Sequence, residues 1–216
     1  AFGWQPPEFC HLPLVMGKDG SKLSKRHGST SIRDFREAGY LPEAILNYIT
    51  LLGWSYDDQR EFFTREELEE LFSIDKLNKA PAVFDYKKLT WFNGQYIRMR
   101  DDESLEQLIL PYLQKDGLVD DPITDEQRKI IDEMMPLVRE RLRLLPDITE
   151  LVRFLFTDIR GFDPEDAIPK KSDSETTLKL LRVGRKIHEG FDEKSNDEIE
   201  EEFRLAAEKN EAKLGA

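Results

Sequence analysis

Apolar residues recur at helical spacing over most of the chain after residue 30. In the segment PEAILNYITLLG, which begins at Pro42, apolar positions repeat every three or four residues until Gly53 ends the run. The residues that share this apolar face are Ala44, Ile45, Tyr48, Ile49 and Leu52. This spacing predicts an amphipathic helix that buries one face in a core.

Capping sequences mark the starts of several further helices. Thr64, Thr124 and Ser195 are each followed three residues later by Glu or Gln, which is the capping-box pattern, and a periodic apolar run follows each. Ser31 and Asp85 have the same chemistry, because a short side chain with an oxygen can accept from the free N–H groups of a first helical turn. We therefore expect all five residues to be N-caps.

Glycine and proline set the expected helix ends. Gly39 and Gly94 are expected to stop the helices that Ser31 and Asp85 open. Pro111 and Pro136 fall inside apolar periodic segments and predict kinks or breaks there. Further helices are expected over residues 102–115, 125–144, 147–157 and 174–189.

The same pattern gives candidate core residues. Leu178, Leu181 and Ile187 are expected in the core of the last helical region. Trp91 and Phe92 are neighbours in sequence and cannot share a helix face, so at least one of them should be buried. We interpret Trp91 as a packing residue.

Strand signals are nearly confined to HLPLVM at residues 11–16, which predicts one short strand and a mainly α chain. The charge composition changes near residue 100, where we expect a domain boundary. A polar, proline-containing segment over 161–174 is interpreted as a joint between helices.

Composition excludes several classes of protein. The 216 residues contain one cysteine, Cys10, so no disulfide framework or thiolate cluster is expected. No apolar run reaches membrane-spanning length, and no signal peptide is visible. Net charge is -12, with 14 basic and 14 acidic residues in 1–100 and 18 against 30 in 101–216. Any contact with phosphate must therefore be local rather than a property of the whole charge.

A cluster of cations breaks this acidic background. Lys22, Leu23, Ser24, Lys25 and Arg26 follow directly after a segment with two glycines, in the sequence VMGKDGSKLSKR. Glycines let backbone N–H groups approach an anion, and ammonium groups supply mobile positive charge. The loop is suited to a polyphosphate, and the alternative is a solvated basic turn.

Three segments carry a resemblance to a known family. HLPLVMGKDGSKLSKRHG resembles the signature loop of class I aminoacyl-tRNA synthetases in its glutamyl form. GYLPEAILNYITLLGWS at 39–55 and FDYKKLTWFNGQYIR at 84–98 are similar to the family segments that follow. Together they cover roughly the first 100 residues in family order.

The resemblance implies a domain plan. Residues 1–30 would be the end of an α/β Rossmann catalytic domain with the KLSKR loop, 31–100 a helical stem-contact-like domain, and 101–216 a helical anticodon-binding-type bundle truncated at its C-terminus. No His-x-Gly-His motif occurs, since His11, His27 and His188 lie far apart. The chain is therefore expected to be a piece of a longer ligase, with no complete set of catalytic residues and no activity alone.

The resemblance also implies a reaction and its partners. The parent ligase would activate L-glutamate with ATP and Mg²⁺ and transfer it to tRNA(Glu), as a monomer in a bacterial-type cytoplasm or an organelle matrix. Lys25 would contact ATP, Lys22 would flank it, and Ser24 would bond a phosphate oxygen or fix the loop. Arg26 and His27 would either contact ATP or fix the loop. No membrane partner and no protein metal site are expected.

Candidate contacts to tRNA are basic residues on helices. By resemblance these are Lys87, Lys88 and Arg98, with Arg33, Arg36 and Arg100 nearby, and Arg139, Arg141 and Arg143 towards the anticodon. Arg141 stands about where the family uses an arginine to read a base, a role that suits a planar guanidinium. The alternative for the last three is pairing on the helix surface with Glu140 and Asp147.

Three other functions stay open at this point. A glutaminyl-tRNA synthetase shares the loop, but its anticodon region is built of β-barrels, whereas residues 101–216 look helical. Short glutamyl-queuosine-type paralogues lack an anticodon region altogether. An acidic helical protein-interaction module would have no nucleotide role.

Overall fold

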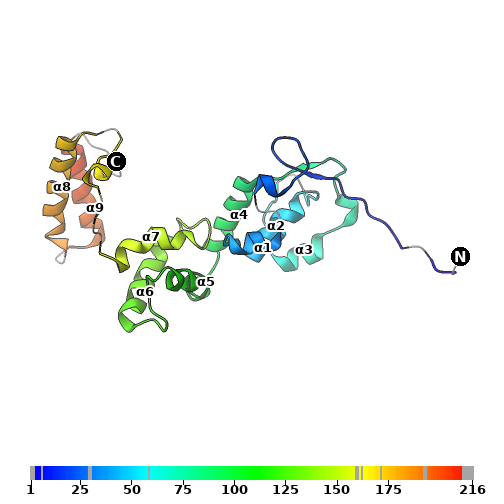
Figure 1. The fold of residues 1–216 in the computed structure, drawn as a ribbon, viewed down its shortest axis with the longest axis horizontal. Helices are drawn as coiled ribbons and strands as arrows, with labels where there is room; N and C mark the ends of the chain where they lie inside the picture. Colours follow the sequence, from blue (N-terminus) through cyan, green and yellow to red (C-terminus); the bar gives the residue numbers. More distant parts are fainter. Residues whose placement is uncertain are drawn as a thin grey trace. The chain divides into compact units, whose positions relative to one another are not determined.

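The computed structural model describes residues 3–5, 7–28, 31–57, 59–158, 161, 163–170, 172–191 and 194–210. These residues form a mainly helical chain with one small sheet, as expected from the sequence (Figure 1). The chain divides into two compact units, residues 1–157 and 158–216, which are described separately. Residues 162 and 171 of the expected joint lie outside the described residues.

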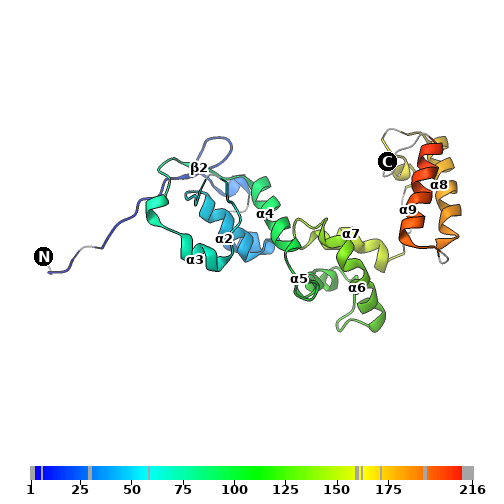
Figure 2. The ribbon, with the colours of Figure 1, turned by 180° about the vertical axis from the view of Figure 1, so that it is seen from behind.

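The first unit contains seven α-helices in its described residues. They are α1 (Ile32–Glu37), α2 (Pro42–Leu51), α3 (Arg65–Leu71), α4 (Tyr86–Arg98), α5 (Asp102–Lys115), α6 (Asp125–Arg139) and α7 (Asp147–Phe156). Strands β1 (Val15–Met16) and β2 (Ala82–Val83) pair in parallel, and 3-10 turns occupy Lys25–His27 and Ile74–Lys76. In the second unit, a 3-10 turn at Pro164–Ala167 precedes α8 (Ser174–His188) and α9 (Asn196–Lys209), which lie side by side in both views (Figures 1 and 2).

The predicted N-caps are confirmed. Ser31, Thr64, Thr124 and Ser195 each form a complete capping box at the start of α1, α3, α6 and α9. The Asp85 side chain accepts from the backbone N–H groups of Lys87 and Lys88 at the start of α4. These contacts depend on residues within one turn, which is why the sequence alone predicts them.

Among the described residues of the first unit, buried apolar side chains gather in three clusters. The largest joins α5, α6 and α7 to Leu41 and Ala44 at the start of α2, so residues on both sides of position 100 share a core. An aromatic cluster contains Phe35, Tyr48, Phe84 and Phe92, and a third surrounds Trp54.

Buried Asn93 ties these parts together. Its Oδ1 accepts from the backbone N–H of Leu41 at 2.7 Å, and its Nδ2 donates to the carbonyl of Arg143 at 2.6 Å. One side chain of α4 thereby satisfies a backbone group at the start of α2 and another just before α7.

Several predicted helix and strand ends are wrong. Gly94 does not stop a helix but lies inside α4, where a Cβ would come within 3.1 Å of the Arg143 side chain. Pro111 and Pro136 lie within α5 and α6 without ending them, and α6 ends at Arg139 rather than residue 144. Only the last two residues of the strand expected at 11–16 pair with another strand. Pro13 has no N–H to donate to a ladder.

The predicted burial is only partly confirmed. The expectation that at least one of Trp91 and Phe92 is buried is confirmed by Phe92, which is fully buried. Trp91 is 44% exposed and packs edge-to-face against Phe62. Ile49 is also 44% exposed although it shares the apolar face of α2.

In α8, Leu178 and Leu181 are 49% and 58% exposed, and Ile187 is half-buried. The buried residue of α8 is Thr177 among those described, and a Cβ on the half-buried Gly184 would lie 3.6 Å from Phe203 of α9. Neither leucine is therefore part of a buried core, although Leu181 lines a groove together with Gly184 and Phe203 of α9.

Candidate functional site

The basic loop is held by the small sheet. β1 pairs with β2, and the N–H of Phe84 donates to the carbonyl of Met16 at 2.8 Å. The chain then turns back on itself, because the N–H of Leu23 donates to the carbonyl of Val15 at 2.9 Å and the N–H of Gly17 donates to that of Ser21 at 2.8 Å. Gly20 has a φ of +75°, which a glycine adopts at little cost. Residues 15–28 thus form a tight hairpin followed by the Lys25–His27 turn.

Side chains lock this hairpin to the turn. The Oδ1 of Asp19 accepts from the N–H of Ser21 at 3.0 Å and lies 3.1 Å from the Nε2 of His27. Its Oδ2 lies 3.3 Å from the Arg26 guanidinium, which also donates to the Ser21 hydroxyl at 2.6 Å. The backbone N–H of Ser21 lowers the pKa of the Asp19 carboxyl well below its usual range, and bonds from the Ser21 hydroxyl and His27 lower it further. The Asp19 carboxyl is therefore ionised at neutral pH.

The candidate phosphate-binding residues differ in what they contact. Lys22 and Lys25 are exposed, and neither side chain forms an ion pair with a described residue. Arg26 is exposed but paired with Asp19, and the Ser24 hydroxyl lies 3.1 Å from the Nδ1 of His27. Leu23 is half-buried against the aromatic core and anchors the loop. Two free ammonium groups therefore project from a fixed loop, an arrangement that can bind an anion.

Two contacts were not foreseen from the sequence. Asp19 is the centre of the loop's hydrogen bonds, and Lys18 pairs with the Asp85 cap of α4 at 2.9 Å. The Asp-Gly-Ser sequence at 19–21 is a signal for an Asx turn, which could have indicated the role of Asp19 in the hairpin. The contact of Lys18 joins residues far apart in sequence and has no local signal.

Four of the nine candidate RNA contacts form ion pairs within the described part of the chain, and one of these four is Arg100, which pairs with Glu43 at 2.6 Å. Lys88 pairs with Glu61 at 2.5 Å, Arg98 lies 3.8 Å from Glu140, and Arg139 pairs with Asp102. By contrast Lys87, Arg141 and Arg143 are exposed, and within the described residues none of them forms a side-chain ion pair.

The alternative, in which the side chains of Arg139, Arg141 and Arg143 pair with Glu140 and Asp147, is not found among the described residues. Glu140 contacts Arg98 instead. Asp147 accepts from the backbone N–H groups of Arg143 and Leu144.

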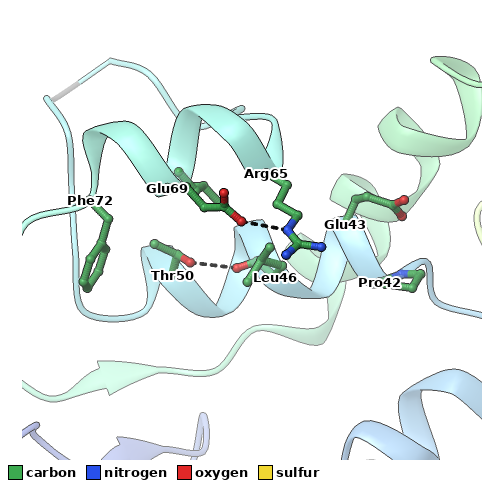
Figure 3. Close-up of a pocket in the computed structure, with 8 residues that line it drawn as sticks. Pro42, Glu43, Leu46, Thr50, Arg65, Glu69 and Phe72 are labelled. Atoms are coloured by element: carbon green, nitrogen blue, oxygen red, sulfur yellow. Dashed lines mark hydrogen bonds and ion pairs between the residues drawn. The ribbon is translucent and has the colours of Figure 1, made fainter.

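A groove of about 620 Å³ lies between α2 and α3 and was not predicted. Figure 3 shows one ion pair in the groove, with the Nε of Arg65 2.9 Å from Glu69, and the Thr50 hydroxyl donating to the carbonyl of Leu46 at 2.9 Å. Glu43, at one end, accepts from Arg100 at 2.6 Å. The other carboxylate oxygen of Glu43, Oε2, is buried without a hydrogen-bond partner among the described residues. The basic loop remains the candidate site because it carries the exposed cations.

No helix within the described residues is long and apolar enough to cross a membrane. The same residues contain no group of three or more His, Cys, Asp or Glu side chains placed to hold a metal ion.

Comparison with known proteins gives a consistent result. A family model described as tRNA synthetases class I (E and Q), catalytic domain, matches residues 1–91, and one described as anticodon binding domain matches residues 104–216. The glutamate–tRNA ligase of Borreliella burgdorferi is 48% identical over 215 residues, which cover 100% of this chain and 44% of that protein. The corresponding ligase of Treponema denticola is also 48% identical, over 237 residues that cover 100% of this chain and 46% of that protein.

A solved structure supports the same assignment. The crystal structure of a glutamate tRNA ligase from Elizabethkingia meningosepticum in complex with its amino acid superposes with a TM-score of 0.70 at 29% identity, covering 99% of this chain and 44% of that one. The chain thus spans less than half the length of the curated relatives it matches. With class I catalytic-domain sequence in its first 91 residues and an anticodon binding domain over 104–216, the chain belongs to the glutamate–tRNA ligase family of class I tRNA synthetases.

Proposed function

We propose that this chain acts within a glutamate–tRNA ligase, where it supplies the loop that binds the phosphates of ATP and part of the surface that binds tRNA(Glu). The observation that supports this most is the pair of exposed, unpaired ammonium groups of Lys22 and Lys25 on a loop fixed by hydrogen bonds, within the part of the chain that the structure describes. The 216 residues alone are not expected to catalyse the reaction.

The chemistry needs little from this loop beyond charge and position. A carboxylate oxygen of glutamate attacks the α-phosphorus of ATP, and pyrophosphate leaves as glutamyl-adenylate forms. A hydroxyl of the terminal adenosine of tRNA then takes the glutamyl group, and AMP leaves. Because a carboxylate is a nucleophile at neutral pH, activation requires no general base, and catalysis rests on positioning and on stabilising charge on the phosphates.

Each residue of the loop has a proposed role. Lys25 and Lys22 contact phosphate oxygens, and Ser24 holds the turn or donates to a phosphate. Arg26 must break its ion pair with Asp19 before it can contact a phosphate. Leu23 fixes the loop to the aromatic core. Mg²⁺ would arrive with ATP, bound mainly by the phosphates.

The RNA surface is proposed from the side chains that remain free among the described residues. Lys87 on α4, with Arg141 and Arg143 between α6 and α7, can approach RNA without breaking an ion pair. Lys88, Arg98 and Arg139 are proposed as secondary contacts, because each must first leave an acidic partner. The bacterial relatives support a bacterial-type cytoplasm, and we propose a monomer.

The alternative functions have less support. The relatives named above are glutamate–tRNA ligases, and residues 102–156 form three helices, α5 to α7, with no described strand, which disfavours a glutaminyl enzyme. The anticodon binding domain disfavours both the short paralogues and a scaffold without a nucleotide role.

The proposed ATP contact is tested by Lys25→Ala in the full-length ligase that carries this chain, with glutamate-dependent ATP–pyrophosphate exchange measured in the presence of tRNA. We expect a loss of about 100-fold or more, because a charge that stabilises the transferring phosphates is removed. The matched control is Lys79→Ala, an exposed loop lysine outside the site, which should leave the rate unchanged. Equal rates for the two variants would contradict the proposal.

A further inference from the structure

The carboxylate of Asp19 occupies the centre of the loop without being suited to bind phosphate. An ionised carboxylate repels an anion, and this one already accepts from Ser21, His27 and Arg26. The nearest lysine in sequence, Lys18, points its ammonium group to Asp85 instead. Asp19 therefore acts on the loop's other side chains, and any effect on phosphate is indirect.

The hydrogen bonds of His27 connect Asp19 to the KLSKR segment. The backbone N–H of Ser24 donates to the Nδ1 of His27 at 3.0 Å, and the carbonyl oxygen of Ser24 lies 3.2 Å from the same nitrogen. The shorter contact, with the N–H donor, favours an unprotonated Nδ1. The ring proton then lies on Nε2, which faces the Oδ1 of Asp19 at 3.1 Å. Asp19 thus selects the tautomer and orientation of a ring that in turn fixes the start of the Lys25–His27 turn.

Gly17 provides the space that this arrangement needs. A Cβ at position 17 would lie 2.8 Å from the Cδ2 and Nε2 atoms of His27, so only glycine lets the ring sit against the hairpin. The ring is accordingly largely covered, with 14% of its side chain exposed. The hairpin, the ring and the turn form one packed unit.

We propose that Asp19 is a positioning residue for the ATP-phosphate site, acting through His27 and Arg26 to hold Lys25 in place. This inference rests on the proposed function of the loop and adds a residue that contacts neither ATP nor glutamate. The Asp19 carboxylate keeps Arg26 beside the hairpin and fixes the His27 imidazole under the turn. Because Arg26 is paired in this way, Lys22 and Lys25 are the free cations of the described loop.

The kinetic test uses two substitutions in the full-length ligase with tRNA present. Asp19→Ala removes every side-chain acceptor, and we expect kcat/KM for ATP to fall about 10–100-fold while KM for glutamate is unchanged. Asp19→Asn keeps an oxygen for His27 and Ser21 but loses the charge facing Arg26, so it should recover a large part of that loss. A purely structural role would lower the amount of folded enzyme and leave both KM values as they were.

The matched control is Asp57→Ala. Asp57 also lies in an exposed turn and accepts from two backbone N–H groups, those of Gln59 and Arg60, but it lies outside the loop. Its substitution should leave the kinetics unchanged. Rates for Asp19→Ala equal to those for Asp57→Ala would overturn the proposal, as would an Asp19→Asn variant no better than Asp19→Ala.

A second readout needs no activity. In the 216-residue chain, ¹⁵N NMR of the His27 imidazole should show an Nε2–H proton protected from exchange and an unprotonated Nδ1, and Asp19→Ala should remove that protection while the Asp57→Ala chain keeps it. An Nδ1–H tautomer in the unsubstituted chain would overturn the geometry. Failure of the proposed function is recognised separately. It would appear as full ATP–pyrophosphate exchange activity in the Lys25→Ala ligase, whatever the NMR spectrum of His27 shows.

Discussion

Gly39 shows how one residue can serve two contacts, of which only one is visible in the sequence. Its φ of +85° ends α1, as expected for a glycine after a helix. Its carbonyl also accepts from the N–H of Leu145, and a Cβ here would lie 2.2 Å from the Cδ of Pro146. The turn is a local feature, whereas the close approach of a segment about a hundred residues away in sequence depends on the folded core.

We predict that Gly39→Ala lowers the free energy of unfolding of the first unit by about 2–4 kcal/mol, since strain at positive φ adds to a clash with the backbone and Pro146. Denaturation followed by tryptophan fluorescence reports on this unit alone, because Trp4, Trp54 and Trp91 all precede residue 157.

The control is Gly53→Ala. Gly53 has no positive φ, and no neighbouring atom lies within 4 Å of the place that an added methyl group would take, so the change should stay below about 1 kcal/mol. A similar loss for both substitutions would contradict the importance of the contact with Pro146.

At the scale of elements, helix starts could be predicted and several ends could not. The capping box at Thr124 needs only residues 124–127, and α5 spans 102–115 as predicted. The length of α4 instead depends on Gly94, which lies against Arg143 from another part of the chain. Likewise, the spacing of the loop's cations in the sequence was enough to recognise the candidate site. Which cations are paired depends on the fold, because Asp19 pairs with Arg26 and Asp85 pairs with Lys18 only in the folded chain.

The cap of α4 should make stability depend on pH. The bond with Lys18 lowers the pKa of the Asp85 carboxyl below its usual 3.8, and the N–H groups of Lys87 and Lys88 lower it further. A lowered folded-state pKa means that this stabilisation is complete above the unfolded value and is lost as pH falls through the folded one. We predict that stability of the first unit decreases below about pH 4, as measured by urea denaturation at a series of pH values.

Two substitutions test the cause of this acid dependence. Asp85→Asn should flatten the acid part of the plot of unfolding free energy against pH. Lys18→Met should move the loss of stability to higher pH, because the contact that lowers the pKa of Asp85 most is gone. If neither substitution alters the profile, Asp85 does not carry the effect.

On the scale of the whole molecule, charge is unevenly distributed. Net charge is -12, and the excess of acidic residues falls after residue 100, where Arg141 and Arg143 nevertheless stay unpaired within the described residues. The proposed association with RNA would therefore depend on a few placed cations that act against an unfavourable overall charge.

We predict that the chain binds tRNA(Glu) weakly and that its association constant falls steeply with salt, because cations on the RNA are released on binding. Arg141→Ala should weaken binding and reduce the slope of log K against log salt by about 1, as measured by fluorescence anisotropy. Lys129→Ala, which removes an exposed lysine beside Glu133 on α6, should leave the slope unchanged. Binding that does not depend on salt would contradict this account.

The most direct measurement of the central claim is tRNA charging by the full-length ligase that carries this chain, with ATP and either labelled glutamate or labelled glutamine. The account predicts that glutamate is esterified to the 3′ end of tRNA(Glu), that glutamine is not, and that Lys25→Ala abolishes charging while Lys79→Ala does not. Charging with glutamine in place of glutamate, or no charging with either amino acid, would contradict it.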